Sequence, residues 1–138
     1  MVRTATANWQ GNLKEGKGTL SAQSGILDKT NYSFKTRFEE GQKGTNPEEL
    51  LAAAHAGCFT MSVASIIDKK GLIPTSLETT ATLTLEGLSI TTVHLSITGS
   101  VKGLNANEFA TVVKEAEQNC IVSKALKLAI TSEAHFVD

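Results

Sequence analysis

Polar and apolar residues alternate in three short stretches of the first 36 residues. A period of two is typical of strands that bury one face, and glycines separate the stretches as turns would. The sequence therefore predicts a meander of three short strands over Thr4–Gln10, Gly18–Ser24 and Tyr32–Thr36.

A long helix is predicted over residues 47–70. Asn46 can cap it, Pro47 suits the first helical position, and Glu49 can form a capping-box-like pair with Asn46. At the other end, two lysines followed by Gly71 are typical of a helix C-terminus.

The stretch from Leu50 to Ile67 carries no formal charge and approaches the length of a membrane span. It also contains His, Thr and Ser side chains and many small residues, which favour a helix buried on nearly all sides. We expect at most one break in it, near Gly57, and a second subunit to cover part of its surface.

Alternation returns in the second half of the chain. Residues 77–85 and 93–101 predict two strands, with a turn at Glu86-Gly87 between them. A last strand is predicted over 127–137 by the same pattern.

A second helix is expected to begin at Asn105 or Asn107, either of which can cap it. Cys120 follows this helix and precedes a short helical turn over residues 121–126. The sum predicts a single α+β domain over residues 1–138, with antiparallel sheets packed on the long buried helix. The inward positions of the second helix follow helical spacing: Phe109, Val112, Val113 and Ala116.

Composition narrows the function. The 13 basic and 14 acidic residues are spread along the chain, so no basic stripe indicates nucleic acid or an anionic membrane as partner. The N-terminus lacks an apolar signal-peptide core, so a cytoplasmic location is expected. A stable disulfide is unusual there, and the two cysteines could be one disulfide, two free thiols or a pair that switches between them.

Cys58 lies within the predicted long helix, where a cysteine is most often a small core residue. A reactive cysteine needs thiolate character and therefore a nearby cation or dipole. In an unbroken helix Cys58 lies about 18 Å from Asn46, too far for the helix N-terminus to contribute. A break near Gly57 would restore that contribution.

Arg37 is the candidate cation, at the end of the third predicted strand, although a lone arginine there also fits a solvated surface. Glu48 or Glu49 could hold its guanidinium, and helix capping explains either glutamate equally well. Cys120 lies near a helix start, which favours a thiolate, or it is a second core cysteine.

Metal binding is not expected. His55 and Cys58 lie one helical turn apart and could ligate zinc, but two ligands do not make a site. Cys120 with His94 or His135 shows no recognised spacing.

These segments together resemble the OsmC/Ohr family of cysteine-based organic hydroperoxide reductases, the OsmC branch in particular. The similarity runs nearly end to end, and the stretch from Gly44 to Phe59 is its specific part. Its segments are Ala7-Asn8-Trp9-Gln10-Gly11, Gly16-Lys17-Gly18-Thr19, Thr36-Arg37-Phe38-Glu39, Gly44-Thr45-Asn46-Pro47-Glu48-Glu49-Leu50, Ala53-Ala54-His55-Ala56 with Cys58-Phe59, and Asn119-Cys120 with Val122-Ser123.

The resemblance implies an OsmC-like fold, an intertwined homodimer and a role for four residues. Cys58 corresponds to the peroxidatic cysteine and Cys120 to the resolving cysteine. Arg37 corresponds to the arginine that activates the thiolate, and the intertwined dimer would allow it to reach Cys58 from the other subunit. Glu48 corresponds to the glutamate that pairs with this arginine. Ile121 departs from the family pattern, which often has proline there, and a less rigid loop is the expected consequence.

The function expected from this resemblance is a thiol-dependent peroxidase that reduces organic hydroperoxides, and hydrogen peroxide less efficiently. Apolar neighbours of Cys58 such as Phe59, Leu50, Leu51 and Met61 would favour organic substrates. No cofactor is expected, and an external dithiol, of the lipoyl type by resemblance, would reduce the enzyme. The alternatives are a non-enzymatic thiol redox sensor and a small-ligand-binding protein on the same fold.

Overall fold

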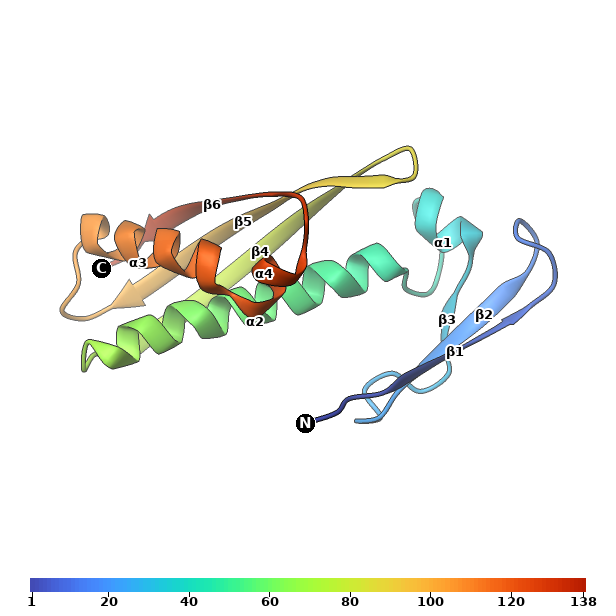
Figure 1. Ribbon diagram of the computed structural model, residues 1–138, viewed down its shortest axis with the longest axis horizontal. Helices are drawn as coiled ribbons and strands as arrows, with labels where there is room; N and C mark the ends of the chain where they lie inside the picture. The colour runs from blue at the N-terminus through green and yellow to red at the C-terminus, as the bar shows by residue number, and fades with distance from the viewer. The chain divides into compact units, whose positions relative to one another are not determined.

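The computed structural model describes residues Met1–Asp138, which form two compact units, Met1–Leu50 and Leu51–Asp138. Figure 1 shows the order of the elements along the chain. The first unit holds a small sheet and a short helix, and the second holds a larger sheet and its covering helices. Each unit is described in turn.

The sheet of the first unit confirms the predicted meander. Strands β1 (Ala5–Gln10), β2 (Lys17–Ala22) and β3 (Thr30–Tyr32) are antiparallel in that order. Gly18 of β2 lies opposite Trp9 and Tyr32, whose rings are 5.5 Å apart. A Cβ at Gly18 would come within 2.8 Å of the Tyr32 ring carbon Cζ, so only glycine allows this close approach.

The third strand differs from its predicted span. It ends at Tyr32, and the helix α1 (Phe34–Phe38) follows it. The cause is a capping box: the Thr36 amide donates to Ser33 Oγ (3.1 Å), and the Ser33 amide donates to Thr36 Oγ1 (2.8 Å). Arg37 therefore lies on helix α1, and the prediction that it lies at the end of a strand is wrong.

Helix α2 (Pro47–Lys69) matches its prediction and is unbroken at Gly57. Asn46 caps it, since its Oδ1 accepts from the Glu49 amide at 2.8 Å. By length and composition α2 could cross a membrane, yet only 28% of its most apolar window is buried within the chain. The expectation of burial on nearly all sides is therefore not met by one chain, in which α2 buries a single face.

The sheet of the second unit is mixed. Strands β4 (Pro74–Glu86) and β5 (Ser89–Val101) form the predicted antiparallel hairpin. Strand β6 (Ala129–Phe136) instead runs parallel to β5, so the expectation of a wholly antiparallel sheet is wrong for this strand. The helices α3 (Ala106–Asn119) and α4 (Ile121–Ala125) form the crossover that a parallel pair requires.

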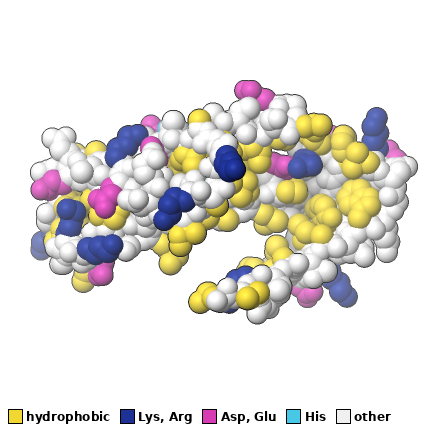
Figure 2. Space-filling view, viewed as in Figure 1, with side chains coloured by type: hydrophobic (Ala, Val, Ile, Leu, Met, Phe, Trp, Pro, Cys, Tyr) yellow, Lys and Arg dark blue, Asp and Glu magenta, His cyan; other side chains and the backbone are white.

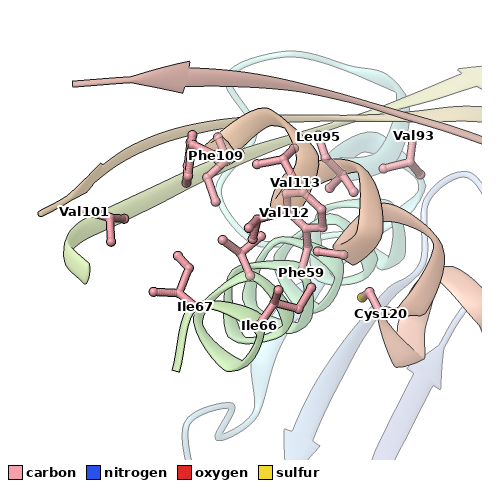
Figure 3. Packing of buried hydrophobic residues seen from close by; sticks show 13 residues of the cluster. Phe59, Ile66, Ile67, Val93, Leu95, Val101, Phe109, Val112, Val113 and Cys120 are labelled. Carbon is pink, nitrogen blue, oxygen red and sulfur yellow. The ribbon is translucent and has the colours of Figure 1, made fainter. Parts of the chain in front are cut away.

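The hydrophobic core lies between one face of this sheet and the helices α2 and α3. Figure 3 shows side chains of α2 and α3 meeting those of β5, with Cys120 at the edge of the cluster. Figure 2 shows that other hydrophobic side chains reach the surface. Met61 is 74% and Ile121 75% exposed. The core residues are Phe59, Val63, Ile66, Ile67, Val93, Leu95, Ile97, Val101, Phe109, Val112, Val113, Ala116 and Cys120.

Candidate functional site

The fold brings the two cysteines together in the second unit. Cys58 lies on α2, whereas Cys120 is the residue between α3 and α4, with φ −57° and ψ 132°. Both are free thiols, and both line the same pocket. Cys120 is buried and Cys58 is half-buried, so reagents in the pocket reach Cys58 first.

The pocket has a volume of about 690 Å³ and a mixed lining. Met61, Ile66 and Ile121 supply apolar surface, while Lys69 and Lys124 supply positive charge. The remaining lining residues are Ser62, Ser65, Glu115 and Asn119.

Among the apolar neighbours expected around Cys58, Met61 does line the pocket. Phe59 does not, because it is fully buried in the core. The apolar contact surface of this pocket therefore comes from Met61 together with residues of α2 and α4 that were not expected.

The surroundings of Cys58 favour its thiolate. Burial raises the pKa of the thiol, but hydrogen bonds from the Cys120 thiol and from the amides of Val122 and Ile121 outweigh burial and lower it. Because α2 is unbroken at Gly57, no helix N-terminus lies there to favour the thiolate. Backbone donors of α4 favour it instead, and the sequence did not indicate them.

The surroundings of Cys120 have the opposite effect. Its burial raises the pKa of the thiol, and donating a hydrogen bond to Cys58 raises it further. The amide and hydroxyl of Ser123 and the amide of Val122 oppose this rise without cancelling it. At neutral pH the pair therefore consists of a thiolate-prone Cys58 and a protonated Cys120.

A buried histidine lies one helical turn before Cys58. His55 is fully buried on α2, and its Nε2 lies 2.8 Å from the Oγ of Ser123 on α4. Burial lowers the pKa of His55, so the ring is neutral. Its other nitrogen, Nδ1, is buried without a hydrogen-bond partner.

Arg37 and Glu48 are paired within the first unit. Arg37 Nε donates to Glu48 Oε1 at 2.7 Å, and Nη2 donates to the same oxygen. The hydrogen bond with Glu48 is the largest cause of a raised Arg37 pKa. Glu48 Oε2 is buried without a partner. Glu49, the other candidate partner of Arg37, accepts a hydrogen bond from Thr45 Oγ1 at 3.1 Å. The four predicted site residues thus form two pairs, one in each unit.

Arg37 also lies in the wall of a second pocket, of about 260 Å³. The guanidinium carbon lies 5.8 Å from the centre of the Phe38 ring. The pocket lies within the first unit and is largely apolar, so it can accept an organic group beside a fixed positive charge. Its lining is Trp9, Leu13, Tyr32, Ser33, Phe34, Arg37 and Pro47.

No group of three or more His, Cys, Asp or Glu side chains is arranged to hold a metal ion. His94 and His135 both lie 3.4 Å from Glu133 Oε1 on the exposed sheet face.

Comparison with known proteins identifies relatives over most of the chain. The family model described as OsmC-like protein matches residues 40–135. Peroxiredoxin OsmC of Escherichia coli is 45% identical over 129 residues, which are 91% of this chain and 90% of that protein. Organic hydroperoxide resistance protein OhrA of Bacillus subtilis is 34% identical over 125 residues, 88% of this chain and 86% of that protein.

Solved structures agree in fold. An OsmC-like protein of unknown function from Vibrio cholerae superposes with a TM-score of 0.74 at 18% identity, covering 97% of this chain and 99% of that one. Organic hydroperoxide resistance protein OhrB of Bacillus subtilis gives a TM-score of 0.66 at 22% identity, covering 97% and 98%. The match to the family model and the relatives at 45% and 34% identity establish that the chain belongs to the OsmC-like family.

Proposed function

We propose that this protein is a thiol-dependent peroxidase that reduces organic hydroperoxides to alcohols, and hydrogen peroxide less efficiently. The observation that carries the proposal is the cysteine pair in one pocket, with hydrogen bonds that lower the pKa of Cys58. The names of the relatives, a peroxiredoxin and organic hydroperoxide resistance proteins, support peroxide chemistry.

In the first step the Cys58 thiolate attacks the terminal oxygen of the hydroperoxide. The oxygen–oxygen bond breaks, the alkoxide takes up a proton and leaves as the alcohol, and Cys58 becomes a sulfenic acid. The Ile121 and Val122 amides stabilise the attacking thiolate before the reaction.

In the second step the Cys120 sulfur attacks the Cys58 sulfur. The sulfur–sulfur bond forms, the sulfur–oxygen bond breaks, and the hydroxyl leaves as water with the proton of Cys120. An external dithiol, of the lipoyl type in our proposal, then reduces the disulfide and becomes a disulfide itself. The cycle uses no cofactor, and the reducing cytoplasm, where we place the protein, suits such a dithiol.

Arg37 and Glu48 orient the peroxide and favour the Cys58 thiolate in this proposal. The ion pair fixes the guanidinium, and its free N–H groups can donate to a peroxide oxygen. The aromatic pocket that Arg37 lines would hold the organic part of the substrate. Leu13, an exposed residue in the wall of this pocket, offers a test. Leu13→Asp should lower kcat/KM for an aromatic hydroperoxide and leave kcat/KM for hydrogen peroxide unchanged. The control Leu13→Met should leave kcat/KM unchanged for both substrates.

We further propose that the active form is a homodimer in which a second copy covers the exposed face of α2. Exposed residues recur along α2 every three or four positions, and Gly57 has nothing within 4 Å of its Cβ position. Gly57→Glu should therefore leave a single chain folded but reduce the dimer measured by analytical ultracentrifugation. Thr82→Glu, which adds the same charge on exposed β4, is the matched control. A monomeric wild-type protein would refute the dimer.

One experiment tests the function: peroxide consumption with excess lipoyl-type dithiol for wild type, Cys58→Ser and Cys120→Ser. We expect full turnover in the wild type, none in Cys58→Ser, and slower turnover in Cys120→Ser, where the dithiol must reduce the Cys58 sulfenic acid directly. Turnover in Cys58→Ser would refute the mechanism. Stoichiometric oxidation of the wild type without turnover would indicate a redox sensor instead, and no thiol oxidation would indicate a ligand-binding protein.

A further inference from the structure

His55 and Ser123 link the two cysteine-bearing segments through the core. His55 precedes Cys58 by three residues on α2, and Ser123 follows Cys120 by three residues on α4. The 2.8 Å hydrogen bond between them is therefore a buried connection one helical turn from each thiol. Both partners are buried, so water does not compete for this hydrogen bond.

Ser123 is also the third residue of α4, whose N-cap is Cys120. Hydrogen bonding by its amide and its hydroxyl lowers the pKa of the Cys120 thiol against the effect of burial. Since a hydroxyl carries a single proton, Ser123 can donate it to Cys120 only if it does not donate it to His55. The 2.8 Å hydrogen bond then runs from His55 Nε2–H to the Ser123 oxygen, which requires the proton of the neutral ring to be on Nε2.

The unpartnered Nδ1 supports this tautomer. If the proton were on Nδ1, a buried N–H would have no acceptor, and Nε2 would take the Ser123 proton away from Cys120. With the proton on Nε2, both hydrogen bonds are made and only a lone pair is left without a partner. The second arrangement therefore satisfies more of the buried donors.

We propose that His55 is a positioning residue for disulfide formation: its Nε2–H holds the Ser123 hydroxyl so that this hydroxyl donates to the Cys120 sulfur and keeps Cys120 beside Cys58. The proposal rests on the peroxidase cycle described above and concerns its second step. In that step the Cys120 sulfur is oxidised and the Cys58 sulfenic acid is reduced as water leaves. When the external dithiol later opens the disulfide at Cys58, the same hydroxyl stabilises Cys120 as the departing thiolate.

Rapid-quench kinetics after one equivalent of hydroperoxide test the proposal, with mass spectrometry separating sulfenic acid from disulfide. Ser123→Ala and His55→Leu should each slow disulfide formation about tenfold, the effect of losing a hydrogen bond to a charged or reacting sulfur. The double variant should be no slower than Ser123→Ala, because His55 acts through Ser123. Ser123→Thr keeps the hydroxyl and should restore the rate.

Sulfenic acid formation separates positioning from a merely structural role. In the Cys120→Ser background, the first step should proceed at the same rate with and without Ser123→Ala. A ¹⁵N spectrum of the histidine ring should show the proton on Nε2 in the wild type. Disulfide formation at the wild-type rate in Ser123→Ala, equal slowing of both steps, or a proton on Nδ1 would each overturn the proposal.

A thiol oxidant such as diamide keeps this test independent of the peroxidase function. If the wild type forms the Cys58–Cys120 disulfide with diamide but does not react with hydroperoxides, the proposed function fails. Slower diamide-driven closure in Ser123→Ala would then still support the positioning role, and unchanged closure would refute it.

Discussion

The Ile121 amide donates a hydrogen bond to the Cys58 thiolate, and the substitution Ile121→Pro removes this donor. Proline at position 121 has no N–H, and it suits the first position of a helix, which Ile121 occupies in α4. The preceding Cys120 has φ −57° and ψ 132°, the conformation that a residue before proline favours. The Ile121 side chain is 75% exposed, so little packing is lost. Ile121→Pro should therefore change the donor and leave the fold intact.

The size of the effect follows from the hydrogen bond. A hydrogen bond to a charged group contributes about 1.5–3 kcal/mol, and the Ile121 amide is the weakest of the three donors to Cys58, so the lower limit applies. The pKa of Cys58 should rise, and at pH values below the wild-type pKa the thiolate fraction should fall about tenfold. Since a more basic thiolate is also more nucleophilic, with a Brønsted coefficient of about 0.4–0.5, the reaction rate should fall only about threefold.

Two measurements on one sample check both numbers. Thiolate absorbance as a function of pH, in the Cys120→Ser background, reports the Cys58 pKa, and stopped-flow kinetics with hydroperoxide report the rate. Ile121→Ala removes the side chain and keeps the amide, so it should keep the wild-type Cys58 pKa and shows how much of any rate change comes from the lost side chain. The lost hydrogen bond to Cys58 should offset the entropic gain of about 0.4–1 kcal/mol that proline brings, so the free energy of unfolding should change little, and a large loss would indicate damage to the fold instead. A Cys58 pKa equal in the proline and alanine variants would refute the role of this amide.

Three further predictions concern other parts of the molecule. Because burial lowers the pKa of His55, the unfolded chain binds a proton that the folded chain excludes, so the free energy of unfolding should decrease as the pH drops below about 6.5. Urea titrations at several pH values should show this dependence in the wild type and not in His55→Gln. Gly99→Ala would place a Cβ 2.8 Å from Cε2 of the Phe109 ring and should lower the free energy of unfolding by about 1–3 kcal/mol, with recovery in the Phe109→Leu background. Glu48→Gln should reduce kcat/KM for hydroperoxide about tenfold, because the half-exposed Arg37 loses a charged partner. The free energy of unfolding should change by less than about 1 kcal/mol. An unchanged kcat/KM would exclude this pair from the reaction.

Local signals in the sequence were sufficient for most of the secondary structure. Asn46 and Pro47 predicted the start of α2, and helical spacing predicted the buried face of α3. Alternation located the strands but gave neither the direction of β6 nor the end of β3. A period of two is the same for parallel and antiparallel strands, and it does not distinguish a strand end from a short helix capped by Ser33.

The candidate site was predictable only as separate residues. Nothing local in the sequence places Cys58 beside Cys120, because the β5–α3–α4–β6 crossover brings them together. The backbone donors of Ile121 and Val122 carry no side-chain signal at all, so no residue pattern could have indicated them. The spacing of His55 to Cys58 and of Cys120 to Ser123 was visible, but its meaning depends on α2 and α4 lying together.

The unequal environments of the two cysteines explain the order of the proposed cycle. Cys120 is 2% exposed at the edge of the core, so its proton is retained and Cys120 donates a hydrogen bond to Cys58. Cys58 is half-buried at the pocket and accepts this hydrogen bond along with those of two amides of α4, so it is the more acidic and the more accessible thiol. Once Cys58 is a sulfenic acid, the same retained proton is available to the leaving hydroxyl. Exchanging only the neighbouring side chains would not reverse these roles, because burial of Cys120 and the direction of α4 are properties of the fold.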